Sequence, residues 1–242
     1  MRLCAVIPTY RHVKQLPRIS AALLAHCERV FIVDDGNTSS DREAIATLHA
    51  PDRGIEVIRL EVNGGKGAAM VAGLRAAIAA GFSHALQIDA DGQHDVADLP
   101  TFIDAAKAKP EALICGKAVY DASVPSGRKF GRYITHFWVW VETASFDIAD
   151  TMCGYRIYPL APVNAILTRT HVGSRMDFDT EIAVRLHWRG VPVVNIPTKV
   201  IYPEDNVSNF AMLSDNVRIS LMHTRLFLQA PIHWIAKPFR RR

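Results

Sequence analysis

Short apolar runs alternate with segments of helical spacing through the first half of this chain, and this alternation constrains its fold most. The runs are rich in apolar and β-branched residues and are closely followed by Pro, Asp, Asn or Gly; they occupy residues 2–7, 29–33, 55–60, 84–88 and 112–115. The segments between them have the periodicity of helices, at 16–27, 41–49, 67–80 and 99–108. Strands that alternate with helices predict an α/β fold, with a mostly parallel central sheet flanked by helices.

The second half of the chain is less regular. After Gly116 the alternation stops, and we expect a flexible loop rich in Gly, Ser and basic residues at 125–132, followed by an aromatic segment at 133–141. A helix at 178–188, a strand at 191–196 and an amphipathic helix at 213–229 complete the pattern. No linker, repeat or change of composition separates the parts, so we expect residues 1–242 to form a single domain.

Composition excludes several classes of protein. Hydrophobic residues make up 49% of the chain, enough for a sizeable core, and the longest uncharged run, residues 76–88, is shorter than the roughly 20 residues that cross a bilayer. The four cysteines are scattered without the spacing of a metal site, which favours a reducing cytoplasm. With a net charge of +4 and no recognised motif, nucleic acid is a poor candidate partner.

The stretch LQIDADGQHD places Asp89 and Asp91 where the strand at 84–88 ends. Ligands of parallel sheets bind beyond the carboxyl ends of the strands, and residues two apart in extended chain point to the same side. Two adjacent carboxylates repel each other and are costly to desolvate, so their proximity indicates a cation between them or a partner that carries one. Oxygen ligands suit Mg²⁺ or Mn²⁺, which typically completes its shell with water and substrate phosphates.

An Asp-rich turn also occurs for backbone reasons alone, and for an isolated D-x-D pattern this is the commoner explanation. Two features favour a ligand site. The pattern follows a strand of a parallel α/β fold, and a second acidic pair, Asp34 and Asp35, ends another strand. A diphosphate held through a metal ion is therefore the interpretation we carry forward.

Five segments together resemble the family 2 glycosyltransferases of the GT-A fold, in particular the dolichyl-phosphate mannosyltransferase-like members. In chain order they are VIPTY, VDDG, NGGKGAA, DADGQH and GYRIY, and the resemblance covers about residues 3–200. Each motif is weak alone, whereas their order and spacing are fairly specific. The resemblance implies a nucleotide-sugar donor, a UDP- or GDP-sugar, and an inverting transfer. The alternative is a non-catalytic protein that keeps the fold and binds a nucleotide, against which the intact Asp89, Asp91 and Gln93 speak. It also divides the chain into a nucleotide-sugar-binding half at 1–116, an acceptor half at 117–205, and an amphipathic helix with a basic tail at 206–242.

The resemblance also assigns residues. The nucleoside would be contacted by Pro8 and Tyr10 after the first strand and by Asp35, with Asp34 beside it, after the second. Metal and diphosphate would be bound by Asp89, Asp91 and Gln93, with Asp91 counted among the catalytic residues. The family often has Leu where Gly92 stands, a departure that loosens the turn without removing a ligand. His94 lies beside this site and is more simply read as a structural or hydrogen-bonding residue than as a ligand.

Lys66 opens the helix that follows the Gly-rich turn Asn63-Gly64-Gly65, and two readings of it stay open. At a helix N-terminus it would add to the attraction for the donor phosphates. Alternatively, it is a solvated lysine beside a turn whose glycines serve close packing. The turn is not a P-loop, because Leu60 and Gly67 stand where that motif requires Gly and Ser or Thr.

The acceptor side also leaves two possibilities. If the acceptor is a polyprenyl phosphate, it is already anionic and needs charge screening, which Arg128 and Arg132 in the expected loop would provide. If the acceptor is a hydroxyl, a carboxylate must remove its proton, and Asp179 is the preferred candidate for this base. The alternative is that Asp179 or Asp177 only caps the helix at 178–188. Glu181 and Arg185 are expected to form an i, i+4 pair.

Two further predictions concern Arg156 and the end of the chain. Arg156, in the GYRIY segment, is expected to lie in the site or in a structural ion pair, with Asp150 as its partner. Leu213, Val217, Leu221 and Leu228 form a helical stripe with basic residues nearby, so this segment either packs on the core or lies on an anionic membrane surface. Because a lipid-linked acceptor favours the second reading, we expect a cytoplasmic protein with peripheral contact to the inner face of the membrane.

Overall fold

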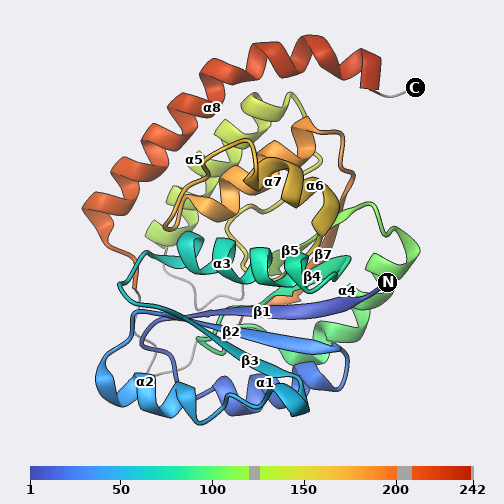
Figure 1. Ribbon diagram of the computed structural model, residues 1–242. Helices are drawn as coiled ribbons and strands as arrows, with labels where there is room; N and C mark the ends of the chain where they lie inside the picture. The colour runs from blue at the N-terminus through green and yellow to red at the C-terminus, as the bar shows by residue number, and fades with distance from the viewer. Residues whose placement is uncertain (120–125, 201–208, 241–242) are drawn as a thin grey trace.

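A single mixed sheet of seven strands organises the fold, in the order β3-β2-β1-β4-β6-β5-β7. The computed structural model describes residues 1–119, 126–200 and 209–240 (Figure 1). The strands are β1 (Leu3–Thr9), β2 (Arg29–Asp35), β3 (Ile55–Leu60), β4 (His84–Gln87), β5 (Leu113–Val119), β6 (Arg156–Pro159) and β7 (Val193–Lys199). The first four strands pair in parallel with one another, and β5 pairs in parallel with β7. Strand β6 runs antiparallel to both β4 and β5.

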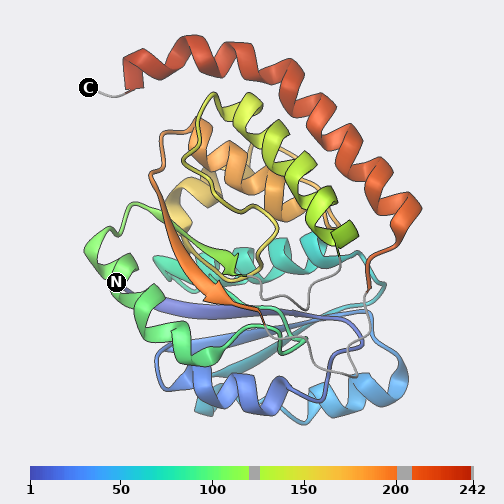
Figure 2. The ribbon, with the colours of Figure 1, turned by 180° about the vertical axis from the view of Figure 1, so that it is seen from behind.

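Helices cover both faces of the sheet (Figures 1 and 2). One core lies beneath α3 (Lys66–Ala79), α5 (Ser126–Thr143), α6 (Leu160–Leu167), α7 (Phe178–Trp188) and α8 (Met212–Arg240). The other lies beneath α1 (Leu16–Leu24), α2 (Ser39–Ala46) and α4 (Leu99–Ala108). Alternate residues of β1 enter the two cores, Val6 on one side and Ile7 on the other. The central strands are therefore nearly uninterrupted apolar runs, as a sheet buried on both faces requires.

The α/β fold with a mostly parallel sheet is confirmed, and the largest error lies in the second half. The prediction of a flexible loop at 125–132 is wrong from residue 126 onward, because α5 already begins at Ser126. Helix α5 has a buried side with residues at helical spacing, namely Thr135, Val139 and Glu142. This side faces the region where α5 contacts α7 and α8. Strand β6 and helix α6 were not predicted, and β6 joins the two expected halves in one sheet.

Helix α8 has two opposite apolar faces. Its inward face contributes Met222, Leu226 and Ala230 to the core over α5 and α7. The stripe predicted from the sequence lies on the other side, since Leu213, Val217, Leu221 and Leu228 are at least half exposed. The helix therefore does pack on the core, as one of the two readings expected, but through the face opposite to the predicted stripe. No helix in the described part of the chain has the length and hydropathy needed to span a bilayer.

Candidate active site

The carboxyl ends of β1, β2 and β4 lie at one edge of the sheet, and the candidate residues follow them. Pro8 lies in β1 opposite Val33 of β2, and Tyr10 comes directly after β1 with the Arg11 guanidinium 4.9 Å from its ring centre. Asp35 is the last residue of β2. Asp89 comes two residues after the end of β4. The parallel register of these strands thus gathers residues that are up to 81 positions apart in sequence, from Pro8 to Asp89.

Lys66 bridges two carboxylates at this edge. Its Nζ lies 2.8 Å from Oδ1 of Asp89 and 2.7 Å from Oδ2 of Asp179. Burial alone would lower the pKa of Lys66, but the charges of Asp179 and Asp89 outweigh it and raise the pKa above its ordinary value. Burial would raise the pKa of Asp89, yet Lys66 and His94 hold it well below its usual range. The solvated-lysine reading is therefore wrong: Lys66 is a largely buried cation between two anions.

The carboxylate of Asp179 is held by a hydrogen-bonded chain of two residues that were not among the predicted site residues. Gln87 donates from Nε2 to Oδ1 of Asp179 at 2.9 Å, and the hydroxyl of Tyr158 donates to Oε1 of Gln87 at 2.7 Å. All three side chains are buried. Both oxygens of Asp179 thus have partners, and the carboxylate anchors Lys66. The N-cap position of α7 is occupied by Asp177, without a side-chain capping bond, so the capping alternative is wrong for Asp179.

Arg156 is fully buried and holds the backbone around the site. Its guanidinium donates to three carbonyl oxygens: Cys153 at 2.9 Å, Asp179 at 2.5 Å, and Thr151. The prediction that Asp150 is its partner is wrong. The backbone of the loop before β6 turns its carbonyls toward the guanidinium, so Arg156 joins that loop to the first turn of α7 and thereby sets the position of Asp179.

Asp150 instead pairs with Arg132 of α5, whose Nη2 lies 2.6 Å from Oδ2. The same carboxylate accepts the backbone N–H groups of Ala118, Met152 and Cys153. Burial would raise the pKa of Asp150, but His136 and Arg132 hold it well below its usual range. Arg132 is therefore already in an ion pair, which ties α5 to the loop before β6. The side chain of Arg128 lies outside the described residues.

The two acids that end β2 serve different partners, because successive strand residues point to opposite faces. Asp35 accepts the N–H groups of Gly64 and Gly65 at 2.8 and 2.9 Å, and burial raises its pKa while these bonds lower it. Asp34 pairs with Arg59 and accepts from Asn37, which also donates to the carbonyl of Thr9. Both acids thus shape the loops at the rim of the sheet.

The Gly-rich turn packs tightly against the loop before α7. The N–H of Ala68 donates to the carbonyl of Ser174 at 2.8 Å. A Cβ at Gly67 would lie 2.4 Å from the carbonyl oxygen of Gly173, a distance that no side chain tolerates. The first turn of α3 is thus partly covered by protein. The role of this turn in the structure is to present Lys66 and to hold Asp35.

Asp91 and Gln93 lie in the turn after β4. Oδ1 of Asp91 accepts the backbone N–H of Gln93 at 3.0 Å. Burial raises the pKa of the Asp91 carboxyl, and the charge of Asp89 raises it further. Gly92 has a φ of +74°, in the left-handed region that favours glycine. The geometry of the turn therefore explains why Gly stands where the family often has Leu.

The donor set at Asp89 and Asp91 fits Mg²⁺ or Mn²⁺. Both residues offer carboxylate oxygens, and Asp91 uses one of its oxygens for a backbone bond. Within residues 1–119, 126–200 and 209–240, no group of three or more His, Cys, Asp or Glu side chains is arranged to hold an ion. Two carboxylates, with water and donor phosphates in the remaining positions, are how Mg²⁺ is commonly bound.

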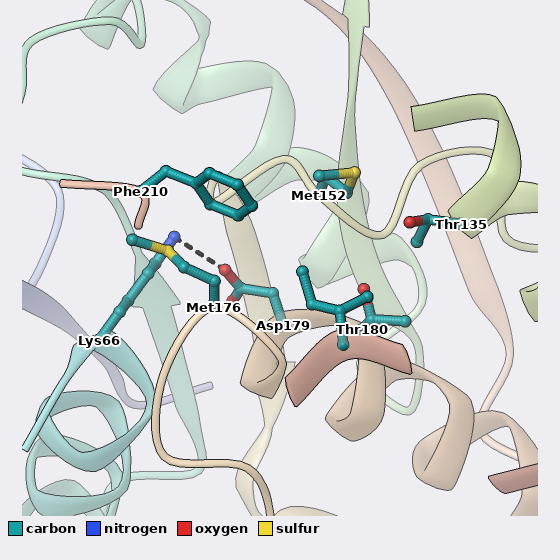
Figure 3. Close-up of a pocket in the computed structure, with 8 residues that line it drawn as sticks. Lys66, Thr135, Met152, Met176, Asp179, Thr180 and Phe210 are labelled. Atoms are coloured by element: carbon teal, nitrogen blue, oxygen red, sulfur yellow. Dashed lines mark ion pairs between the residues drawn. The ribbon is translucent and has the colours of Figure 1, made fainter. Parts of the chain in front are cut away.

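A small cavity of ≈ 90 Å³ opens beside the Lys66–Asp179 pair. Figure 3 shows Phe210, Met176 and Met152 around the ion pair, with Thr135 of α5 and Thr180 of α7 on the far side. Ile219 of α8 also lines it. A polar floor beneath apolar walls is typical of a ligand site. The methionines and Phe210 come from loops and could not be assigned to a site from sequence, whereas Gln87, a lone amide in a buried strand, was a detectable signal.

Comparison with known proteins fits this geometry. The family profile described as glycosyl transferase family 2 matches residues 4–169. The chain belongs to this family. It is 24% identical over 209 residues to an undecaprenyl-phosphate mannosyltransferase of Micrococcus luteus, covering 84% of this chain and 85% of that one. It is 28% identical over 235 residues to a polyprenol monophosphomannose synthase of Mycolicibacterium smegmatis, covering 90% and 83%.

Solved structures agree on the fold. Glucosyl-3-phosphoglycerate synthase from Mycobacterium tuberculosis, in complex with Mn²⁺, UDP-glucose and phosphoglyceric acid, superposes with a TM-score of 0.66 at 12% identity, covering 94% of this chain and 79% of that one. TarS from S. aureus in complex with UDP-GlcNAc gives 0.60 at 16% identity, covering 95% and 67%. The GT-A fold, the dolichyl-phosphate mannosyltransferase-like resemblance and the assignment as a glycosyltransferase enzyme are confirmed.

Proposed function

We propose that this glycosyltransferase moves a sugar, with inversion, from a UDP- or GDP-sugar to a lipid-linked acceptor, a polyprenyl phosphate. The observation that carries the proposal is the carboxylate pair Asp89 and Asp91 at the rim of a GT-A sheet. It is supported by the relatives, which include an undecaprenyl-phosphate mannosyltransferase and a polyprenol monophosphomannose synthase. The Mn²⁺ and UDP-glucose complex of the structural neighbour supports the donor and the metal.

The reaction puts negative charge on the departing nucleoside diphosphate. A divalent ion bound at Asp89 and Asp91 supplies Lewis-acid stabilisation of that charge. Lys66, held beside them by Asp179, contributes a further fixed positive charge on the donor side. Pro8 and Tyr10 at the end of β1 are positioned for the nucleoside, and Asp34 and Asp35 shape the loops around it. Gln93 holds Asp91 in place through its backbone N–H.

A phosphate acceptor suits the chemistry of Asp179. A hydroxyl acceptor requires a free carboxylate base, and both oxygens of Asp179 are already engaged by Lys66 and Gln87. A phosphate acceptor is anionic without deprotonation and needs positive charge instead. Arg132 lies three residues from the cavity residue Thr135, and Arg128 precedes it by one turn of α5. We assign these two arginines to the acceptor side.

A donor panel tests the proposal. Purified protein with Mn²⁺ is incubated with UDP- and GDP-sugars, first alone and then with a polyprenyl phosphate in detergent. We expect one donor to raise the melting temperature by several degrees, since binding stabilises the folded state by mass action. The same donor should release nucleotide only when the lipid phosphate is added. A panel without any thermal shift or release contradicts the enzymatic proposal, and release with a glycan hydroxyl alone contradicts the acceptor.

We also propose that α8 contacts an anionic membrane surface from the cytoplasmic side. Its outward stripe continues from Leu213 through Leu228 to Ile232 and Ile235, all strongly exposed. The one acid of α8, Asp215, is buried, while Arg218 is exposed beside the stripe. The same helix places Ile219 in the cavity wall next to Lys66. An apolar stripe flanked by bases suits an anionic bilayer, and here it adjoins the candidate site.

Vesicle binding tests this surface. Replacing Leu221 and Leu228 together by Glu is expected to lower binding to vesicles with about 30% phosphatidylglycerol by tenfold or more, because two charges enter the interface. The matched control replaces Ala44 and Ala46 of α2 together by Glu, which adds two charges to exposed positions on the other face of the sheet. Co-sedimentation measures the bound fraction. Equal binding by the double variant of α8, or a dimer that this variant dissociates in sedimentation velocity, contradicts the proposal.

A further inference from the structure

The two carboxylates that hold Lys66 differ in how firmly they are fixed. The side chain of Asp179 is 7% exposed, and its second oxygen accepts from Gln87. Its backbone carbonyl is held by Arg156. The side chain of Asp89 is 23% exposed, and Nε2 of His94 lies 3.8 Å from its Oδ2. Lys66 therefore has one rigid partner and one accessible partner.

Carboxylates gather around Lys66. Its ammonium contacts Asp89 and Asp179, Asp91 lies near Asp89, and the buried guanidinium of Arg156 offsets part of the charge of Asp179. A divalent ion on Asp89 and Asp91 would lie close to this ammonium, because Nζ is 2.8 Å from an oxygen of Asp89. Two cations at such a distance in a partly buried site repel each other strongly. The ammonium and the ion therefore compete for Asp89.

We propose that Lys66 is an exchangeable counter-ion of Asp89. It neutralises this carboxylate while no divalent ion is bound, and it withdraws onto Asp179 when the ion takes Asp89. Asp179, fixed by Gln87 and Tyr158, is the positioning residue that keeps Lys66 in the site during this exchange. The inference rests on the proposed metal site, and it adds a built-in competitor that sets the affinity of that site for the ion.

Manganese binding without any donor tests the exchange. Lys66→Met is expected to bind Mn²⁺ about tenfold more tightly than the wild type, because it removes a competing cation. The free aquo ion is measured by electron paramagnetic resonance during titration of the full chain. Lys66→Gln is a second neutral variant whose amide still donates to Asp179, and it decides the outcome if Lys66→Met unfolds. Lys107→Met, an exposed lysine of α4, is the matched control and should bind as the wild type.

A double-mutant cycle with Asp179→Asn separates anchoring from plain electrostatics. If Asp179 anchors Lys66, Asp179→Asn leaves the ammonium to Asp89 alone and weakens Mn²⁺ binding when Lys66 is present. In the Lys66→Met background the same change should have little effect. Equal weakening in both backgrounds means that Asp179 acts on the ion only by its charge, which overturns the anchoring role.

The remaining outcomes distinguish this inference from the proposed function. If Asp91→Asn abolishes Mn²⁺ binding but neither neutral variant at Lys66 tightens it, the metal site stands and the exchange is overturned. If Asp89→Asn and Asp91→Asn bind Mn²⁺ as the wild type does, the metal site itself is overturned, and the exchange with it. The same holds if neither the wild type nor any variant binds Mn²⁺. Tighter binding by both neutral variants supports the exchange.

Discussion

Asp91→Asn is expected to lower glycosyl transfer by about 1000-fold. The carboxylate supplies charge to a divalent ion that stabilises the leaving diphosphate, and removing one preorganised group of this kind typically costs about 100- to 1000-fold in rate. The amide keeps the size of the side chain and its carbonyl oxygen for the Gln93 N–H, so the turn after β4 is retained. The measurement is nucleotide release with the donor and lipid phosphate that support transfer.

The control for this variant is Asp104→Asn, which neutralises an exposed carboxylate of α4 and should leave turnover unchanged. The stability of Asp91→Asn is measured alongside. Burial and the charge of Asp89 raise the pKa of the Asp91 carboxyl, so its ionised form is costly in the folded chain and the neutral amide should not destabilise it. Turnover of Asp91→Asn within about threefold of the wild type would remove the basis of the metal assignment.

Arg156→Met is expected to destabilise the fold by about 4 kcal/mol or more. Three buried carbonyls, those of Thr151, Cys153 and Asp179, lose their donor together. Each buried acceptor left without a partner costs about 1–3 kcal/mol. Replacing a buried ion pair by an apolar pair can be neutral, but here the acceptors belong to the backbone and remain.

Thermal unfolding measures this effect, and a shift of about 10 °C is expected for a chain of this size. Arg42→Met is the matched control. It removes an exposed arginine of α2 and should change stability by no more than about 0.5 kcal/mol. Arg156→Lys should recover part of the loss, because the ammonium can reach some of the carbonyls. If Arg156→Met unfolds with the wild-type midpoint, the guanidinium does not hold the loop to α7.

The regular elements were largely predictable from local pattern. The helices at 99–108 and 178–188 and the strand at 55–60 were predicted with the bounds that the structure has, because their apolar periodicity and flanking residues agree. The pattern failed at α5. Its first turns carry Gly and basic residues typical of a loop, and contacts with α7 and α8 decide its conformation. Local propensity is a weak signal where such tertiary contacts override it.

The sequence by itself determined the α/β fold, the family, and the location of Asp35, Asp89 and Asp91 at strand ends, because the succession of elements along the chain and the residues that end them are local properties. Only the tertiary structure decided which partners these side chains take. It placed Lys66 between Asp89 and Asp179, and it turned the stripe of α8 outward. Such pairings join residues about 20 to 110 positions apart in sequence, so they depend on how the helices pack on the sheet.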